Sequence, residues 1–197
     1  MSYVLFDLFS AALYACLIQN FIFTGGYGAS EAIRMSAKPK NLFPLSVFIV
    51  YFSILTSVIC RLLEFNSRIS NLQPLYHNFI FYGVLCLLYL VTVLIVRLAN
   101  APKRVIRRVG IAAFNTLVLS VPFINYRAGF SIAEAIGSGL GAGVAFIIAV
   151  LLINIGLQRL EQNTSIPRHF KGTPAIFIYV SLLSLAFMAM SGKSIFI

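Results

Sequence analysis

The chain has 197 residues, of which 60% are hydrophobic and only 10% are charged, and its formal net charge is +10. A soluble domain carries roughly a quarter charged residues, so this composition excludes an ordinary soluble enzyme. The basic residues lie outside the apolar stretches. We therefore interpret their excess as a membrane-topology signal and a contact for anionic lipid, and we expect no nucleic-acid partner.

Six stretches contain no Asp, Glu, Lys, Arg or His, and each has 18 to 24 residues. They are Leu8–Ser30, Asn41–Cys60, Asn78–Val96, Val109–Tyr126, Ala135–Gln158 and Gly172–Gly192. At about 1.5 Å per residue, each can cross a hydrocarbon core about 30 Å thick. The sequence therefore predicts an all-α integral membrane protein, with six transmembrane helices in a single domain over residues 1–197.

The first stretch ends in three closely spaced glycines, Gly25, Gly26 and Gly28. Glycine adopts non-helical dihedrals without steric cost, so this spacing predicts a break in the first helix. The alternative is that the glycines only end this helix at the interface, because the stretch is already long enough to span. Asp7 and the absence of Lys or Arg before the stretch are untypical of a cleaved signal peptide, so we expect it to remain as a span.

Ser30 follows the glycines and is a residue type that caps helix N-termini, with Glu31 in the first turn beyond it. Glu31 and Arg34 are three residues apart and can pair on one helix face. If the break lies deep in the membrane, this pair is a functional candidate by default. If the break is shallow, it is an ordinary pair at the cytoplasmic rim.

The fourth stretch predicts a second break in the segment Asn115–Ser120, with Pro122 after it. Apolar stretches begin at residues 41 and 135 and at 78 and 172, an offset of 94 in both cases, and Asn20 precedes Asn115 by 95. Three spans per half is an odd number, so residues 1–100 and 101–197 are predicted to be inverted repeats with broken helices 1 and 4. Such repeats place a polar or ion site near the midplane, and our candidates are Asn20, Glu31, Arg34 and Asn115.

The fifth stretch contains four glycines at alternate positions, Gly137, Gly139, Gly141 and Gly143. Small residues four apart let a second helix approach closely, and we expect that helix to belong to the same chain. The same glycines, together with Phe-rich surfaces, also offer packing toward a partner subunit.

Neither the cysteines nor the histidines are arranged for chemistry. Cys16, Cys60 and Cys86 show no CxxC spacing and are expected to behave as small apolar residues. His77 and His169 are expected in loops, without a metal-binding partner at helical spacing. No Ser-His-Asp order, phosphate loop or paired carboxylate is present, so we predict no catalytic residue and no metal site.

The basic residues divide unevenly between the two sides of the predicted membrane. Four lie on the side of the 2–3 and 4–5 connections and the C-terminus: Arg61, Arg68, Arg127 and Lys193. Eleven lie in the 1–2, 3–4 and 5–6 connections: Arg34, Lys38, Lys40, Arg97, Lys103, Arg104, Arg107, Arg108, Arg159, Arg168 and Lys171. The positive-inside rule places these eleven in the cytoplasm, so both termini are predicted outside.

The C-terminal third carries a specific pattern. Arg159-Leu160 is followed by Ile166-Pro167-Arg168-His169-Phe170-Lys171-Gly172, and then by Ser184-Leu185-Ala186-Phe187-Met188 and Ser191-Gly192. It resembles the RnfA/NqrE family, membrane subunits of the Rnf and sodium-pumping NADH:quinone oxidoreductase complexes, whose pattern is RL, a spacer, VPxxFRG and SLAFMGFSG. Asn20-Phe21 with Gly28 and Val109-Gly110-Ile111 before Asn115 also resemble family motifs.

The resemblance implies a cofactor that this chain is not equipped to hold. Family members present one cysteine on each broken helix and share a [2Fe–2S] cluster with a homologous six-span partner of inverted orientation. Here the two cysteine positions are Ser30 and Thr116, and hydroxyls are poor replacements for the thiolates that such a cluster requires. We therefore expect a divergent member that binds no cofactor of its own.

We predict an integral membrane subunit of an Rnf/NQR-type ion-translocating electron transport complex in the bacterial inner membrane. The chain is at most a non-catalytic subunit of a translocase, and its expected partners are the homologous six-span subunit, the other subunits of the complex and lipid. The alternative is a small six-span transporter or an energy-coupled substrate-binding component. Its substrate pocket would have to use the same few polar residues.

Overall fold

The computed structural model describes residues 2–70 and 72–191, which form helices and turns without any strand. In chain order these are α1 (Ser2–Leu13), the π-helical turn η1 (Tyr14–Ile18), α2 (Ala29–Ser36), the 3-10 turn η2 (Pro39–Asn41), α3 (Leu42–Glu64), α4 (Ser67–Ser70), α5 (Pro74–Leu98), α6 (Lys103–Ala113), α7 (Thr116–Ala128), α8 (Ile132–Gln162), the 3-10 turn η3 (Arg168–Phe170) and α9 (Thr173–Ser191).

Five helical segments in the described part of the chain are long and apolar enough to cross a membrane. They are Pro39–Glu64, Pro74–Leu98, Lys103–Ala128, Ile132–Gln162 and Thr173–Ser191. A shorter apolar helix, Tyr3–Ile18, precedes them. The protein is therefore an all-helical, multi-pass membrane protein.

The stretch Leu8–Ser30, predicted as one span, is not a single helix. The helical backbone ends at Ile18 and resumes only at Ala29. The interruption starts well before the glycines, because the side-chain oxygen of Asn20 accepts hydrogen bonds from the backbone N–H groups of Ile22 (3.0 Å) and Phe23 (3.3 Å). A short polar side chain that bonds nearby backbone in this way competes with the helix.

The prediction for Pro122 was wrong, because this residue lies inside α7 and the helix continues to Ala128. The helical backbone is interrupted earlier, between Ala113 and Thr116. Proline removes one intrahelical hydrogen bond, and packing against neighbouring helices can offset that loss in a membrane protein. Here α7 packs against α3, α5 and α8, and Pro122 is buried.

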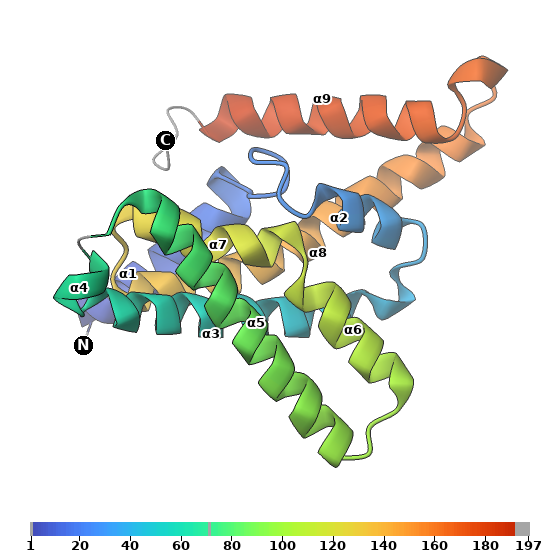
Figure 1. The fold of residues 1–197 in the computed structure, drawn as a ribbon. Coiled ribbons are helices and arrows are strands. Elements are labelled where there is room, and N and C mark those ends of the chain that lie inside the picture. The colour runs from blue at the N-terminus through green and yellow to red at the C-terminus, as the bar shows by residue number, and fades with distance from the viewer. Residues whose placement is uncertain (1, 71, 192–197) are drawn as a thin grey trace.

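The centre of the fold is the pair α3 and α8, which make the most extensive helix contact in the described structure. The helices α1 and α2 pack against α8, while α6 and α7 pack against α3. Figure 1 shows these elements gathered around the two long helices, with α5 and α9 lying to the outside. The buried core is therefore built from both halves of the chain.

The alternate glycines of α8 bring α1 and α3 close to its backbone. A Cβ atom at Gly137 would lie 2.1 Å from the carbonyl oxygen of Leu8 in α1, and one at Gly143 would lie 2.0 Å from a methyl group of Val50 in α3. Gly141 faces α1 and Gly139 faces α3 in the same manner. The glycines thus pack within the chain, and none of these four positions is open to a partner subunit.

The helices α5 and α9 leave most of their apolar surface uncovered. Leu87 and Leu90 on α5 and Leu182 and Leu185 on α9 are each about 60% exposed. The helix α9 is attached mainly at its start, where the ring of Tyr179 fills the space above Gly156 of α8. Further along, Phe187 stacks on Phe23 at 4.7 Å. Lipid or other subunits must cover the remainder in the membrane.

The connections separate into two ends. The α2–α3, α5–α6 and α8–α9 connections lie at one end of the molecule, and the α3–α5 and α7–α8 connections lie at the other (Figure 1). The first end, which we call the basic end, includes the eleven basic residues of the predicted cytoplasmic loops. Lys193, which the sequence assigns to the other side, lies outside the described residues.

The placement of His77 differs from the prediction of a loop. It lies in α5, fully buried, with its ring stacked on Tyr126 at 4.3 Å and against Phe81 at 6.0 Å. The helix begins at Pro74, a residue type favoured at a helix N-terminus. Its first turn therefore includes His77 and precedes the apolar stretch that starts at Asn78. His77 is an aromatic packing residue of the end opposite the basic end.

Candidate functional site: two helix N-termini around one cavity

Two helix N-termini from different halves of the chain meet, with Gly28 and Asn115 buried and Ser30 and Thr116 exposed. The helix α2 begins directly after Gly28, and α7 begins directly after Asn115. The backbone N–H of Gly28 donates a hydrogen bond of 2.8 Å to Oγ1 of Thr116, the first residue of α7. A Cβ atom at Gly28 would lie 2.8 Å from Oδ1 of Asn115, so only glycine allows this approach.

The segment that leads to α2 satisfies its backbone locally. Asn20 is fully buried, and its Nδ2 donates to the carbonyl oxygen of Cys16 at 3.0 Å while its Oδ1 accepts the two amides described above. The N–H of Thr24 donates to the carbonyl of Asn20, and that of Gly26 to the carbonyl of Ile22. Irregular backbone can be buried only when its polar groups are paired, and these hydrogen bonds pair the N–H groups of Ile22, Phe23, Thr24 and Gly26.

Two of its glycines also set its course. Gly26 and Gly28 have φ values of 71° and 76°, in the left-handed region that favours glycine. The chain therefore turns at these two positions and enters α2 with Ser30 and Glu31 facing the α6–α7 junction.

The interruption of the helix in the second half of the chain takes fewer residues. Asn115 is the N-cap of α7, and its Oδ1 accepts the N–H of Leu117 at 3.0 Å. Asn20 and Asn115 thus share one local motif, in which the amide oxygen accepts from the residue two positions on. In the first half a turn of eight residues, 21–28, follows the asparagine, whereas in the second half the helix begins at once.

A cavity of about 230 Å³ lies between these helix starts. Its lining residues are Ser30, Glu31 and Arg34 from α2, Ile111 and Phe114 from α6 and its end, and Asn115 and Thr116 at the start of α7. The structure thus brings together all of the predicted polar residues except Asn20. The Asn20 side chain does not line the cavity; it is fully buried and hydrogen-bonded to backbone groups nearby in the chain.

The charged residues at the cavity form one ion pair. Arg34 donates from Nε to Oε2 of Glu31 at 2.9 Å and from a terminal nitrogen to Oε1 at 2.5 Å. The hydrogen bond with Glu31 raises the pKa of Arg34. The Glu31 side chain is 16% exposed and that of Arg34 is 55% exposed, so the pair lies at the mouth of the cavity.

One polar group at the cavity wall has no partner. Nδ2 of Asn115 is buried and makes no hydrogen bond with any described residue. A buried unpaired donor costs about 1–3 kcal/mol, and so it marks a place where water or a ligand oxygen would be stabilised. The cavity lining includes one carboxylate, one guanidinium and two hydroxyl side chains, so the cavity can hold a small polar or hydrated species.

The donor set does not fit an iron–sulfur cluster. Ser30 and Thr116 supply hydroxyls, and the Thr116 oxygen already accepts the Gly28 amide. None of the three cysteines lines the cavity: Cys16 and Cys60 are buried elsewhere, and Cys86 is exposed on α5. Across the described residues, no three His, Cys, Asp or Glu side chains gather into a metal-binding group. Thiolates are the ligands that such clusters require.

Sequence reasoning missed a second cavity beside the first, of about 440 Å³, at the basic end. Arg104, Arg107 and Arg108 of α6 and Lys38 line it, although the sequence treated them only as loop charges. The spacing of the three arginines could have indicated this cavity, because positions three and four apart share one face of a helix. A further missed residue is Asn154, whose Nδ2 donates to the carbonyl oxygen of Ser36 at 2.6 Å and holds the end of α2 against α8.

Comparison with known proteins identifies relatives of one kind, although no family model matches the chain. It is 42% identical over 78 residues, 40% of each chain, to an ion-translocating oxidoreductase complex subunit of Aromatoleum aromaticum. It is 25% identical over 194 residues, 94% of this chain and 97% of the relative, to the protein of the same name from Rhodobacter capsulatus.

A third relative carries a more specific name. This subunit of the Na(+)-translocating ferredoxin:NAD(+) oxidoreductase complex of Acetobacterium woodii is 21% identical over 187 residues, 92% of this chain and 95% of the relative. Identity is low, but the similarity covers more than nine-tenths of this chain and of each of the last two relatives. The chain is a divergent homologue of the RnfA-type membrane subunits of ion-translocating oxidoreductase complexes.

Proposed function

We propose that this protein is a membrane subunit of an Rnf-type ion-translocating oxidoreductase complex that has lost electron transfer through its own residues. The observation that carries the proposal is the meeting of Ser30 and Thr116 at one cavity. These are the two positions at which the family resemblance expects cysteines. The architecture of a shared metal site is thus present while its ligands are replaced.

The contacts between helices support an inverted repeat of residues 1–100 and 101–197. In the first half, α1 and α2 pack on α8 of the second half. In the second half, α6 and α7 pack on α3 of the first half. The last long helices behave alike, because α5 packs on α3 and α9 packs on α8. In this arrangement the segments α1–α2 and α6–α7 are the broken first helices of the two repeats, and the chain has six spans.

The orientation follows from the charges. With the basic end in the cytoplasm, both termini lie outside and the Glu31–Arg34 pair lies toward the cytoplasmic rim. The protein is located in the inner membrane of a bacterium. The cavity lined by Glu31 and Asn115 provides a short hydrated route for an ion, with Asn20 holding the backbone behind it.

The partner is a second six-span subunit of inverted orientation, together with the other subunits of the complex. Because α1 and α3 occupy the space beside the α8 glycines, the contact with the partner subunit uses the open faces of α5 and α9 instead. Close packing of apolar side chains associates helices where lipid is equally apolar.

Measurement of the iron and acid-labile sulfide content of the purified complex tests the proposal. We expect the chain to purify with a homologous membrane subunit, and we expect a Ser30→Ala/Thr116→Ser double variant to leave the iron content unchanged. The gain-of-ligand variant Ser30→Cys/Thr116→Cys should raise the iron content when the partner supplies its two cysteines.

Two outcomes would contradict the proposal. One is an iron–sulfur signal in the native chain that disappears with Cys16→Ser, which would show rearranged ligands. The other is purification of a functional monomer that transports a solute without any partner, which would favour the small six-span transporter.

A further inference from the structure

The charged side chains that line the 440 Å³ cavity at the basic end are mostly positive. Five cationic side chains converge on it from two segments distant in the sequence, and one carboxylate is present. The cations are Arg34 and Lys38 around the end of α2, and Arg104, Arg107 and Arg108 in the first two turns of α6. Like charges repel, so this convergence raises the energy of the folded chain unless an anion compensates it.

Most of this charge has no internal counter-ion. Glu31 is already paired with Arg34 through two hydrogen bonds, and Arg108 donates to the neutral Oδ1 of Asn41 at 2.6 Å. Within residues 2–70 and 72–191, Lys38, Arg104 and Arg107 form no ion pair. The contact between Arg108 and Asn41 fixes η2 against α6, so the cavity has a defined wall and is more than a cluster of mobile side chains.

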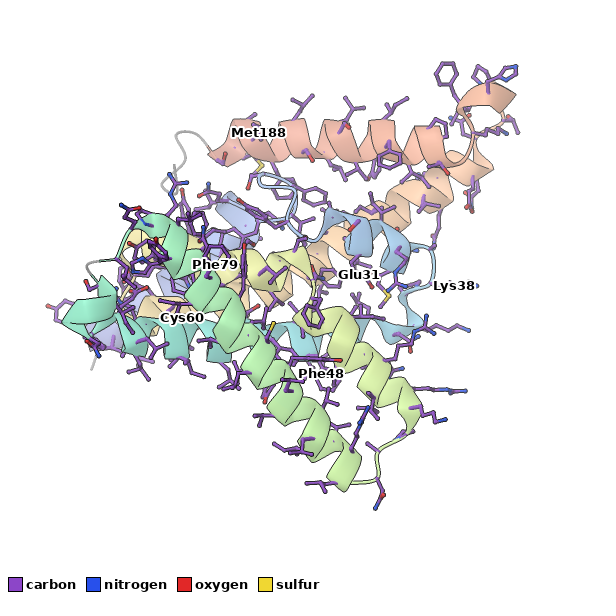
Figure 2. The ribbon with its side chains drawn as sticks, viewed as in Figure 1. Glu31, Lys38, Phe48, Cys60, Phe79 and Met188 are labelled. Carbon is purple, nitrogen blue, oxygen red and sulfur yellow. The ribbon has the colours of Figure 1, made fainter. Side chains whose placement is uncertain are left out.

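The floor of the cavity is apolar. Leu45 of α3 is 2% exposed, and Met35 and Ile111 are half-buried beside it. Lys103, the first residue of α6, also begins a candidate membrane span, so the cavity lies at the end of that span. Figure 2 shows Lys38 extending outward from this end, with Glu31 deeper in the molecule.

We propose that this cavity binds the phosphate of an anionic phospholipid, with Arg104, Arg107, Arg108 and Lys38 around the headgroup and the start of an acyl chain on Leu45 and Ile111. Guanidinium groups match phosphate geometry with paired N–H donors. Basic pockets between membrane helices on the cytoplasmic side favour anionic headgroups. The proposal rests on the orientation proposed above, with the basic end in the cytoplasm, and not on the loss of electron transfer.

Exchange of bound lipid in nanodiscs tests it. The purified chain would be placed in phosphatidylcholine nanodiscs and titrated with fluorescent phosphatidylglycerol. At about 1 kcal/mol per basic residue, equal to about fivefold in affinity, Arg104→Gln/Arg107→Gln should weaken binding about 25-fold. The double variant Arg104→Lys/Arg107→Lys keeps both charges and should lose much less.

A matched control removes the same charge from the same end. Arg97 and Arg159 are exposed and do not line the cavity, so Arg97→Gln/Arg159→Gln should change the affinity by less than about threefold, since the surface effect falls off within a Debye length. Glu31→Gln should act in the opposite direction and strengthen binding, because it removes the carboxylate and releases Arg34. Circular dichroism of each variant shows whether its helices remain folded.

The source of the phosphate is distinguished by competition. Glycerophosphate and inorganic phosphate carry the charge without the acyl chain, so we expect them to displace the lipid only at far higher concentration than lysophosphatidylglycerol does. Equal competition by all three would overturn the lipid assignment in favour of a soluble anion. Equal losses in the cavity and control variants would overturn the site. Binding of an acidic partner protein with no lipid preference would also contradict the proposal.

Discussion

Single residues decide where the backbone of this protein leaves the helix. Asn20 and Asn115 act in the same way, each accepting an amide two residues on, but with different surroundings. After Asn20 the chain must cross eight residues before α2 starts, and it needs left-handed glycines to do so. After Asn115 the helix starts at once. The asparagines, more than the glycines or the proline, therefore define the two interruptions.

Replacement of Gly28 by alanine is expected to be strongly destabilising. Its φ of 76° is in the left-handed region, which costs roughly 1–2 kcal/mol for a residue with a Cβ atom. The Cβ atom would also lie 2.8 Å from Oδ1 of Asn115, and overpacking of this kind adds about 1–3 kcal/mol. Gly26→Ala is the control, because its φ is similar and no atom lies within 4 Å of the added Cβ. Free energies of unfolding in mixed micelles should rank Gly28→Ala well below Gly26→Ala, and equal values would contradict the contact.

Asn115→Ala should remove the N-cap of α7. Loss of such a cap costs about 0.5–2 kcal/mol, while Asn115→Ser retains an oxygen acceptor and should lose less. Because Nδ2 of Asn115 has no described partner, neither variant removes a hydrogen bond donated by that group. Thermal unfolding in detergent checks the order. An equal or larger loss in the serine variant would contradict the role of the Asn115 oxygen as the N-cap acceptor.

At the scale of elements, α8 is the scaffold on which the other half of the chain is assembled. Its glycines remove side chains where α1 and α3 cross, so backbone atoms pack against backbone atoms. In lipid, association of helices depends on such close contact, because burial of apolar surface gives little advantage over lipid tails. This explains why α8 is rich in glycine despite being the longest helix described.

Gly137→Ala should separate α1 from α8. The added methyl group would lie 2.1 Å from a backbone oxygen, so α1 itself must move, at a cost of about 1–3 kcal/mol. Gly110→Ala in α6 is the matched control, since its Cβ would lie 3.7 Å from the hydroxyl of Tyr89, in ordinary contact. There alanine should be neutral or stabilising by up to about 1 kcal/mol through helix propensity. Unfolding of both variants in the same micelles distinguishes them, and equal stabilities would exclude the close crossing.

On the scale of the whole molecule, the basic residues and the uncovered apolar surface lie in different places. Basic residues accumulate at one end, whereas the uncovered apolar faces of α5 and α9 lie along the sides. The first feature predicts how the chain is oriented in the membrane, and the second leaves apolar surface for lipid or for another subunit. The two cavities open near the basic end, so both are positioned for contact with that side of the membrane.

Labelling of introduced cysteines should place the two ends on opposite sides of the membrane. In a Cys86→Ser background, an impermeant maleimide added to intact cells should modify Arg127→Cys and Lys193→Cys but not Arg104→Cys. The eleven-to-four distribution of basic residues is the reason. Inverted membrane vesicles are the control and should reverse the pattern. Modification of Arg104→Cys together with Lys193→Cys from one side would exclude six spans.

The sequence by itself determined the membrane setting, the long helices and the uneven charge distribution, because these follow from local composition and length. It also indicated the neighbourhoods of both interruptions and the polar residues that line the smaller cavity, although it wrongly added Asn20 to them. It could not locate the interruption at Asn20, keep Pro122 inside a helix or bury His77, because each depends on partners elsewhere in the chain. The tertiary structure alone decided that Gly28 contacts Thr116 and that α2 and α6 enclose a basic cavity. Contacts between residues some 70 to 90 positions apart arise from packing around α3 and α8, which no local pattern contains.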